Sequence, residues 1–380
     1  MKQSRPATLK DVAAYANVSI KTVSNVVNEW PYITDETRQK VLDAIQAVGY
    51  RPNQAARSLV TGKTRTVGVL IPDIANPFFG AAMRGCEDVL FQGGYSLLLS
   101  NTNEDLTRER NNLELLLSRG VDALLLWGSR LSCEELEEII GPRLPLVTVE
   151  LRMEPKRPNH ANINIDNQHG AELATRHLVD QGYMRIAHLA GPEDRVTANL
   201  RQAGYLQAIE KAGLPLEKSL IYHASPTIAA GYFATLELLQ SQRPRAIFCY
   251  NDLMAFGALI AARELGLDVP SDLAVVGFDD ITMDTFSEPP LSTVRIPQYD
   301  LGHIAGEIIL QLLQAPSDKP ISYLYPVELI IRGSSCALPF SADERAANLK
   351  NLLSSFIHGS HASLEDLITK PFELGAENAI

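Results

Sequence analysis

The pattern of hydrophobic and polar positions divides the chain into a short helical beginning and a long alternation of strands and helices. In residues 8–49 the apolar side chains recur three or four positions apart, which is typical of helices that bury one face. From Thr66 onward, short continuous apolar runs alternate with stretches of helical periodicity. The runs are residues 67–71, 95–99, 123–126, 146–149, 185–189, 246–250 and 273–277. The pattern predicts an all-α head followed by an α/β body with parallel sheets.

The head shows two short helices joined by a tight turn, which is the outline of a helix-turn-helix. Thr8 and Asp11 predict a capping box for the first helix, and Ser19 is a good cap for the second. The second helix directs three valines to one side: Val23, Val26 and Val27. A third helix, over 34–48, is expected to bury four residues: Val41, Leu42, Ile45 and Val48. The opposite side of the second helix is left free for a partner.

Charge is distributed unevenly between the head and the rest of the chain. Residues 1–65 contain ten Lys and Arg against five Asp and Glu, a net charge of +5, whereas the remainder carries −16. A basic head on an acidic body allows only one end of the protein to approach phosphate groups. The alternative interpretation of the head is a small helical dimerisation module with solvated lysines.

The segment that follows the head favours DNA binding over dimerisation. Residues 50–59 read YRPNQAARSL, in which Pro52 can open a short helix and Leu59 has no sizeable core to enter. The structural alternative is a linker helix whose leucine packs on the head. With these residues the chain resembles the lactose/galactose-repressor (LacI/GalR) family of bacterial transcription regulators, from Thr8 to about Arg332.

The resemblance implies how the protein contacts double-stranded operator DNA. Three residues match the base-reading positions of the family: Ile20, Lys21 and Asn25. Six match its phosphate-contacting positions: Ser19, Thr22, Ser24, Asn28, Thr37 and Asn53. Leu59, with Ala56 beside it, matches the hinge leucine that enters the minor groove and bends the operator. Asn25 departs from the arginine common in the family, and because asparagine pairs well with adenine, the outer operator bases are expected to differ.

The resemblance also implies the domain organisation. The head should cover 1–50, a hinge helix and linker 51–64, and a two-lobed domain for effector binding and dimerisation 65–338. This domain is expected to be periplasmic-binding-protein-like, with two doubly wound parallel-sheet lobes. The chain should cross back after each lobe, so that the first lobe comprises about 65–165 and 295–322. The second lobe should then comprise about 166–294 and 323–338.

Ligands of such sheets bind beyond the carboxyl ends of the strands. That rule nominates residues that follow the runs of the first lobe: Asp73, Phe78, Phe79, Trp127 and Glu150. In the second lobe the resemblance nominates five positions: Arg195, Thr197, Arg201, Asn251 and Asp279. Packing at a helix start is the alternative for Phe79, and a surface ion pair is the alternative for Arg195 and Arg201. Carboxylate, amide and guanidinium groups suit a hydroxyl-rich ligand.

Two departures from the family leave the identity of the ligand open. The chain has no aromatic side chain near Pro226, and it has Arg295-Ile296 where sugar-binding members often have glutamine. The added positive charge indicates either an acidic sugar or sugar phosphate, or simply a surface arginine. We expect a small sugar or sugar-like effector, and both a neutral and an anionic molecule stay open.

Composition and motifs exclude several other functions. The four cysteines are far apart, with no CxxC pair, and are expected to be buried thiols rather than metal ligands. The sequence contains no zinc-protease motif, nucleophile elbow, Walker loop or dinucleotide-binding glycine motif. The chain shows no signal peptide and no apolar run that could span a bilayer. We therefore expect a non-enzymatic cytoplasmic protein with no cofactor and no membrane partner.

Residues 339–380 lie beyond the family pattern. Residues 341–358 are predicted to form an amphipathic helix, with a second short helix over 362–369. The segment lacks a clean leucine heptad, so docking on the body is expected rather than tetramer formation. Altogether the sequence predicts a ligand-responsive repressor that works as a homodimer on a near-palindromic operator. The alternatives are a solute-binding protein of a transport system and a sugar-modifying enzyme on a similar scaffold.

Overall fold

The computed structural model describes residues 7–28, 30–50, 58, 62–151 and 157–336. The chain forms two compact units, Met1–Thr66 and Val67–Ile380, which we call the head and the body. The predictions for Asn53, Ala56 and Leu59 and for the segment 339–380 lie outside the described residues. Within the described part of the chain, no helix is long and apolar enough to cross a membrane.

In its described residues, the head contains three helices: α1 (Leu9–Ala16), α2 (Ile20–Val27) and α3 (Asp35–Val48). The predicted caps are present. The Thr8 backbone N–H and hydroxyl donate to Asp11 Oδ2 over 2.8 and 2.7 Å, and the Thr22 N–H donates to Ser19 Oγ over 3.0 Å. Seven buried side chains form the core: Val12, Ala13, Ala16, Val23, Val26, Val41 and Ala44. These small side chains allow the three short helices to pack closely.

One core prediction for the head was wrong. Leu42 is nearly half exposed, whereas Val41 and Ala44 are buried and Ile45 and Val48 pack partly against the core. Successive residues of an α-helix point about 100° apart, so a helix that buries Val41 and Ala44 turns Leu42 towards solvent.

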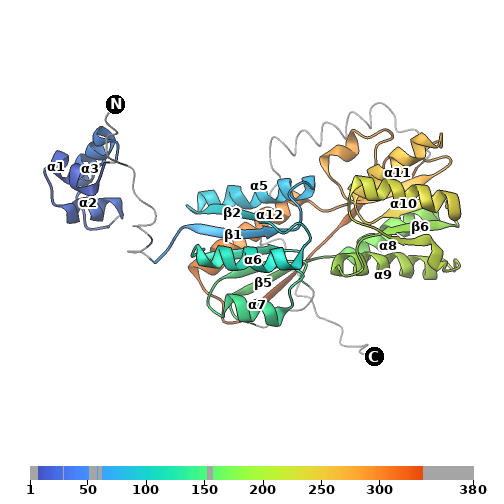
Figure 1. Ribbon diagram of the computed structural model, residues 1–380, viewed down its shortest axis with the longest axis horizontal. Coiled ribbons are helices and arrows are strands. Elements are labelled where there is room, and N and C mark those ends of the chain that lie inside the picture. Colours follow the sequence, from blue (N-terminus) through green and yellow to red (C-terminus); the bar gives the residue numbers. More distant parts are fainter. Residues whose placement is uncertain (1–6, 29, 51–57, 59–61, 152–156, 337–380) are drawn as a thin grey trace. The chain divides into compact units, whose positions relative to one another are not determined.

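The body contains two six-stranded sheets, each covered by helices on both faces (Figure 1). The first sheet has the order β11-β5-β4-β3-β1-β2 and the second β12-β10-β9-β8-β6-β7. We call each sheet with its helices the first and the second lobe. All pairings given for the two sheets are parallel except that of β10 with β12.

The first lobe contains strands β1 (Thr66–Ile71), β2 (Ser96–Asn101), β3 (Ala123–Trp127), β4 (Leu146–Val149), β5 (His160–Ile165) and β11 (Ile321–Tyr325). Its helices are α5 (Pro77–Gln92), α6 (Leu106–Ser118), α7 (Cys133–Ile140) and α12 (Gln298–Gln314). Helices α5 and α12 pack together on one face of the sheet, and α6 and α7 lie on the other face (Figure 1). The first four strands coincide closely with predicted apolar runs. Strands β1, β3 and β4 are almost wholly buried on both faces, whereas β2, at the end of the sheet order, is only half-buried.

The second lobe contains strands β6 (Ile186–Ala190), β7 (Ile221–His223), β8 (Ala246–Cys249), β9 (Ala274–Asp279), β10 (Ser292–Arg295) and β12 (Glu328–Ile330). Its α-helices are α8 (Asn167–Asp180), α9 (Val196–Lys211), α10 (Ile228–Ser241) and α11 (Asp252–Glu264). Short 3₁₀ helices span Lys218–Leu220 and Thr282–Thr285. Helices α8 and α9 pack as one pair and α10 and α11 as the other.

The chain passes between the lobes three times, after β5, after β10 and after β11. The expected last boundary, between 322 and 323, falls inside β11. Tyr325 still pairs with Ile165 of β5 in the first sheet, so the last crossing comes between Tyr325 and Glu328. The expected start of the returning segment was also early, because Arg295 still pairs with Asp279 in the second sheet. The two lobe boundaries are therefore set by how far β11 pairs with β5 and how far β10 pairs with β9.

A fully buried histidine lies in the core of the second lobe. The ring of His188 stacks between Phe248, at 4.8 Å, and Tyr205, at 5.1 Å. Its Nδ1 lies 3.0 Å from the Phe248 carbonyl oxygen, and its Nε2 has no partner among the described residues. Burial lowers the pKa of His188 to about 4, because a charged ring would have no solvent around Nε2.

We predict that this histidine makes the body sensitive to acid. Its folded-state pKa is depressed, so its contribution to stability is complete above pH 6.5 and is lost as the pH falls through about 4. By pH 4 the loss from this residue should reach roughly 3 kcal/mol in the free energy of unfolding. Urea unfolding at pH 7 and at pH 4 measures how much unfolding free energy is lost between the two pH values. This loss should be smaller for His188→Gln than for the wild type, because glutamine does not titrate. An equal loss in both proteins would contradict this assignment.

Candidate functional site

The outer face of α2 is free of core contacts. Ser19, Ile20 and Lys21 are exposed, and four further residues of the predicted DNA-contacting set are half-buried: Thr22, Ser24, Asn25 and Asn28. Val23 and Val26 on the opposite side are buried. A helix held by its valine side and capped at Ser19 can present its polar side to a major groove. Thr37, also half-buried, lies in the first turn of α3, where its N–H donates to Thr34 Oγ1 over 3.4 Å.

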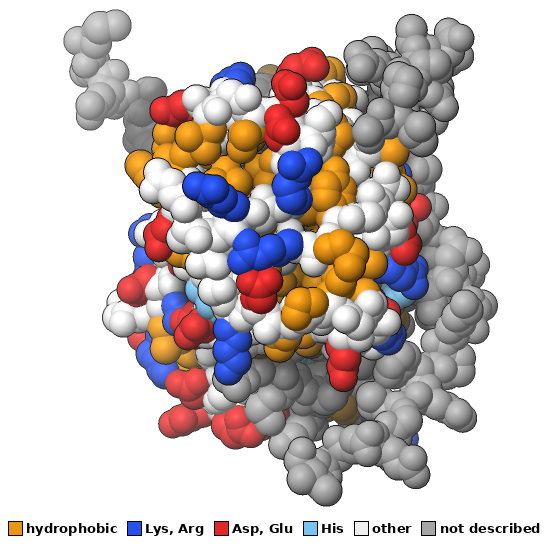
Figure 2. Space-filling model, turned by 90° about the vertical axis from the view of Figure 1, so that its right-hand side faces the viewer, with side chains coloured by type: hydrophobic (Ala, Val, Ile, Leu, Met, Phe, Trp, Pro, Cys, Tyr) orange, Lys and Arg blue, Asp and Glu red, His pale blue; other side chains and the backbone are white. Residues whose placement is uncertain are grey.

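The end of the second lobe shows no concentration of positive charge among its described residues. Figure 2 looks onto this end and shows Lys and Arg side chains interspersed with Asp, Glu and hydrophobic groups. The excess of positive charge therefore stays with residues 1–65, at +5, against −16 for the remainder.

Three aromatic residues of the first lobe meet at the carboxyl end of its sheet. Phe78 and Phe79 begin α5, and Trp127 ends β3. Their rings pack edge to face, with centroids 5.2 Å apart for the two phenylalanines and 5.6 and 5.8 Å from Trp127. All three side chains are buried. Phe79 therefore packs at the start of α5, which is the alternative that the sequence left open for it. The Trp127 indole N–H has no hydrogen-bond partner among the described residues, which leaves a donor for a ligand oxygen.

Arg201 is the centre of the polar groups in the second lobe. Its guanidinium carbon lies 3.7 Å from the Phe278 ring centroid and 4.7 Å from that of Tyr250. Its Nε donates to Asn167 Oδ1 over 2.8 Å, its Nη1 donates to the Tyr250 carbonyl over 2.5 Å, and its Nη2 lies 3.5 Å from Asp279 Oδ1. The guanidinium is therefore fixed in plane and position by groups from three parts of the chain: Asn167, Tyr250 and the adjacent pair Phe278 and Asp279.

Asp279 and Glu150 supply carboxylates to the same region. Burial raises the pKa of Asp279, and the nearby Arg201 opposes that rise. Glu150 follows β4 in the first lobe, and its Oε1 accepts a 2.8 Å hydrogen bond from Asn167 Nδ2. Asn167 thus joins Arg201 of the second lobe to Glu150 of the first. Both carboxylate residues have positive φ, 59° for Glu150 and 125° for Asp279, which marks a strained backbone at both positions.

The remaining nominated residues have more local roles. Thr197 Oγ1 lies 2.8 Å from the Tyr250 hydroxyl, beside the Arg201 stack. Asn251 caps α11 by accepting from the Met254 N–H over 3.0 Å, and its Nδ2 donates to the Pro226 carbonyl over 3.3 Å. Asp73 accepts from the Ala75 N–H over 3.0 Å within its own turn. The structure therefore joins Thr197 to the Arg201 group, whereas the hydrogen bonds of Asn251 and Asp73 serve local structure.

Arg195 bridges the two lobes. Its Nε donates to Glu104 Oε2 over 2.8 Å and its Nη1 to the Gly128 carbonyl over 2.6 Å, and both acceptors belong to the first lobe. A reciprocal ion pair joins Arg130 of the first lobe to Asp194 of the second. Arg130 also donates to the Glu104 carbonyl over 2.6 Å. The two crossed ion pairs, which we call the inter-lobe pairs, hold the facing ends of the lobes together.

Arg295 does not supply free positive charge. Its Nε lies 2.6 Å from Asp280 Oδ2 and its Nη1 lies 2.9 Å from Glu328 Oε1. Asp280 is also paired with Arg332, at 2.6 Å. Arg195, Arg201 and Arg295 are thus each paired with at least one carboxylate. Their positive charge therefore gives no reason to expect an anionic ligand.

The sequence did not point to Asn167, Glu104, Arg130 or Asp194. Asn167 begins α8, and its role depends on the crossing that brings β4, α8 and α9 together. The one local signal was the charged group Glu193-Asp194-Arg195, which follows an apolar strand at the position where ligand-contacting loops are expected.

Comparison with known proteins agrees with both parts of the chain. Residues 8–53 match the family described as bacterial regulatory proteins, lacI family, and residues 175–335 match the periplasmic binding protein-like domain. The HTH-type transcriptional repressor CytR of Escherichia coli (strain K12) is 37% identical over 340 residues, which cover 89% of this chain and 99% of CytR.

Solved structures show the same architecture. The Lac repressor dimer bound to operator and the anti-inducer ONPF matches with a TM-score of 0.77 and 29% identity, over 87% of this chain and 99% of that one. The complex of the transcriptional regulator CelR with cellobiose matches with a TM-score of 0.65 and 29% identity, over 86% and 99%. These relatives are transcription regulators rather than transport proteins or enzymes. The head, the two-lobed body and the extent of these matches lead to one conclusion: the chain belongs to the lacI family of bacterial regulatory proteins.

Proposed function

We propose that this protein is a cytoplasmic transcriptional repressor that binds a near-palindromic operator as a homodimer and responds to a small hydroxyl-rich effector. It reaches the nucleoid through its DNA contacts. The observation that carries the proposal is the polar outer face of α2, which is capped at Ser19, free of core contacts and part of a basic head. The likeness to named repressors over most of the chain supports it.

In the DNA-bound state, Ile20, Lys21 and Asn25 read base edges in the major groove. Six residues contact phosphates and set the position of the head: Ser19, Thr22, Ser24, Asn28, Thr37 and Asn53. The hinge inserts Leu59, with Ala56 beside it, into the minor groove between the half-sites. Base contacts supply sequence preference, and phosphate contacts supply most of the affinity and its dependence on salt.

The effector binds where the carboxyl ends of the two sheets face each other. Arg201 and Asp279 supply donors and acceptors for hydroxyl groups. The indole N–H of Trp127, which has no partner among the described residues, supplies another donor. Seven further residues complete the site: Asp73, Phe78, Phe79, Glu150, Arg195, Thr197 and Asn251. Because the arginines there are already paired with carboxylates, a neutral sugar or sugar-like molecule fits better than an anion. The cellobiose complex of CelR supports a carbohydrate ligand.

Effector binding alters DNA affinity by changing the angle between the lobes. The inter-lobe pairs and the Asn167–Glu150 hydrogen bond cross between the lobes, so these are the contacts that must rearrange. Ion pairs that are partly exposed are worth about 0.2–1 kcal/mol each, so a ligand can exchange them at modest cost. A coupling of about 1–3 kcal/mol is sufficient for allosteric control.

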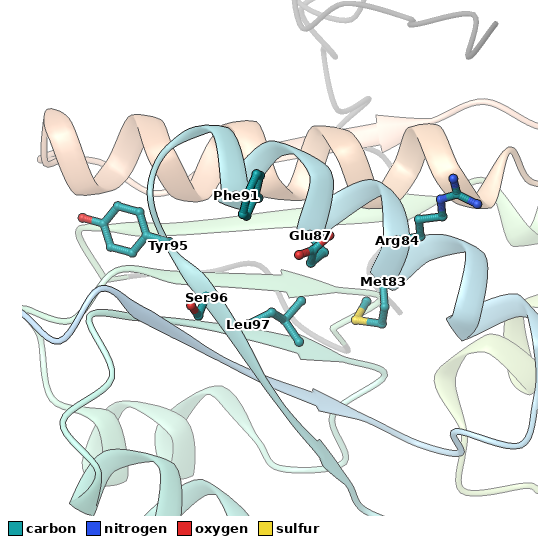
Figure 3. Close-up of a pocket in the computed structure, with 7 residues that line it drawn as sticks. All are labelled: Met83, Arg84, Glu87, Phe91, Tyr95, Ser96 and Leu97. Atoms are coloured by element: carbon teal, nitrogen blue, oxygen red, sulfur yellow. The ribbon is translucent and has the colours of Figure 1, made fainter. Parts of the chain in front are cut away.

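A groove on the outside of the first lobe is the proposed dimer contact. It has a volume of about 480 Å³ and is lined by Met83, Arg84, Glu87 and Phe91 of α5 and by Tyr95, Ser96 and Leu97 at the start of β2 (Figure 3). Strand β2 lies at one end of the sheet order, and Phe91 is 73% exposed. A second copy would cover the same residues by two-fold symmetry, which matches a near-palindromic operator. The Lac repressor dimer on its operator supports this arrangement.

The experiment that tests the function is selection from random duplex DNA. Repeated rounds of binding with the purified protein should enrich one near-palindromic sequence, with adenine at the outer positions opposite Asn25. Binding should weaken steeply as salt rises, because phosphate contacts release counterions. Failure to enrich any sequence over bulk duplex DNA would refute the proposed function.

We predict that Phe91→Asp separates the dimer and weakens operator binding by about 100-fold or more, because the two heads then bind independently. Sedimentation and fluorescence anisotropy measure the two effects. Met184→Asp places the same charge on an exposed apolar site of the second lobe and should leave both properties unchanged. A dimeric Phe91→Asp protein would rule out this groove as the contact.

We predict that Arg201→Lys reduces effector affinity by about 10- to 100-fold, because the planar pattern of donors is lost while the charge opposite Asp279 remains. The probe is whichever neutral sugar raises the melting temperature of the wild-type protein most in a screen. Calorimetry measures its affinity, and operator binding without the sugar should be retained. Arg185→Lys, which alters an ion pair within the second lobe, is the control. Unchanged sugar affinity in Arg201→Lys would remove Arg201 from the site.

A further inference from the structure

Two neighbouring aromatic side chains of the head, Trp30 and Tyr32, are exposed and have no role in the function proposed so far. Trp30 is 51% exposed and Tyr32 is 85% exposed, and both lie between α2 and α3. Their ring centroids are 6.4 Å apart, with the planes inclined by 58°. The core of the head is built from valine and alanine, so these rings place its largest apolar surfaces in solvent.

Two hydrogen bonds fix the position of Trp30 relative to the neighbouring helices. The Trp30 N–H donates to the Asn25 carbonyl of α2 over 2.9 Å. Arg38 Nη2 of α3 donates to the Trp30 carbonyl over 3.0 Å. The Trp30 backbone is therefore tied to a residue of the base-reading face and to a guanidinium, and does not depend on the body for its position.

The aromatic pair also lies between two residues of the predicted DNA-contacting set. In sequence it comes between Asn28, at the end of α2, and Thr37, in the first turn of α3. Both of these residues belong to the phosphate-contacting set. A backbone that contacts both residues comes close to the residues between them, and the net charge of +5 on residues 1–65 favours a polyanion such as DNA.

We propose that Trp30 and Tyr32 pack against the deoxyribose-phosphate backbone beside each half-site and add affinity that does not depend on base sequence. The apolar edges of the sugars cover the rings, and the Tyr32 hydroxyl donates to a phosphate oxygen. The inference rests on the proposed DNA-binding function and extends it to a contact outside the recognition helix. The occupant is double-stranded DNA, and a protein partner is the competing outcome of the test.

The experiment compares Trp30→Ala, Tyr32→Ala and the double variant with the wild type. Fluorescence anisotropy at fixed salt measures binding to the selected operator and to an unrelated duplex of the same length. Each single variant should weaken both complexes by about fivefold to tenfold, with the ratio between them unchanged, because backbone contacts carry no sequence information. Tyr32→Phe should restore most of the loss in Tyr32→Ala. Tyr15→Ala, which removes an exposed ring from α1, should bind as the wild type does.

Two results would overturn the proposal. Unchanged affinity of the double variant for both duplexes would assign the rings to a protein partner instead. A loss confined to the operator would mean that the rings read bases rather than backbone. Thermal unfolding of each variant shows that the head remains folded. The unrelated duplex tests the contact even if selection recovers no operator, so this inference and the proposed function can fail separately.

Discussion

The buried guanidinium of Arg201 is the constraint on which the proposed effector site depends. A charged group that is almost wholly removed from water is tolerated only with several partners, and here Asn167, Asp279, the Tyr250 carbonyl and two aromatic faces supply them. Those partners come from α8, from the strand ends of the second sheet and, through Glu150, from the first lobe. The need to satisfy one cation therefore arranges donors and acceptors where the two sheets face each other.

The contacts between the lobes are of a different kind from those of Arg201, because most of their charged groups are partly exposed. Asp194 and Arg130 of the inter-lobe pairs keep access to solvent, as does Glu104. Water can replace such pairs at little cost, whereas it cannot readily replace the partners of Arg201. A ligand can then exchange the contacts of Arg195 without dismantling the centre of the site. Weak inter-lobe pairs around a rigid Arg201 centre suit a protein in which a small binding energy changes the angle between the two lobes.

Local sequence rules predicted the parts of the structure that depend on local physics. The caps at Thr8 and Ser19 and the buried valines of α2 follow from hydrogen bonding and helical spacing. Strands buried on both faces appeared as apolar runs. Strand β5, in contrast, alternates isoleucine with Asn162 and Asn164, so its sequence does not show the pattern of a buried strand, although Asn162 is buried and accepts from Thr148. Its partner β11 and the crossings after Arg295 and Tyr325 depend on pairing over long separations. The contacts of Asn167 and Glu104 depend on the same pairing, and no local pattern contains them.

The central claim is that occupancy between the lobes and binding of operator DNA are one linked equilibrium. Calorimetry of the neutral sugar selected by thermal shift, with the free protein and with the protein saturated by operator, tests it most directly. The two sugar affinities should differ by the same factor, about 5- to 150-fold, by which the sugar changes the affinity for operator. Equal sugar affinity in the presence and absence of operator would contradict the account, however tightly each ligand bound alone.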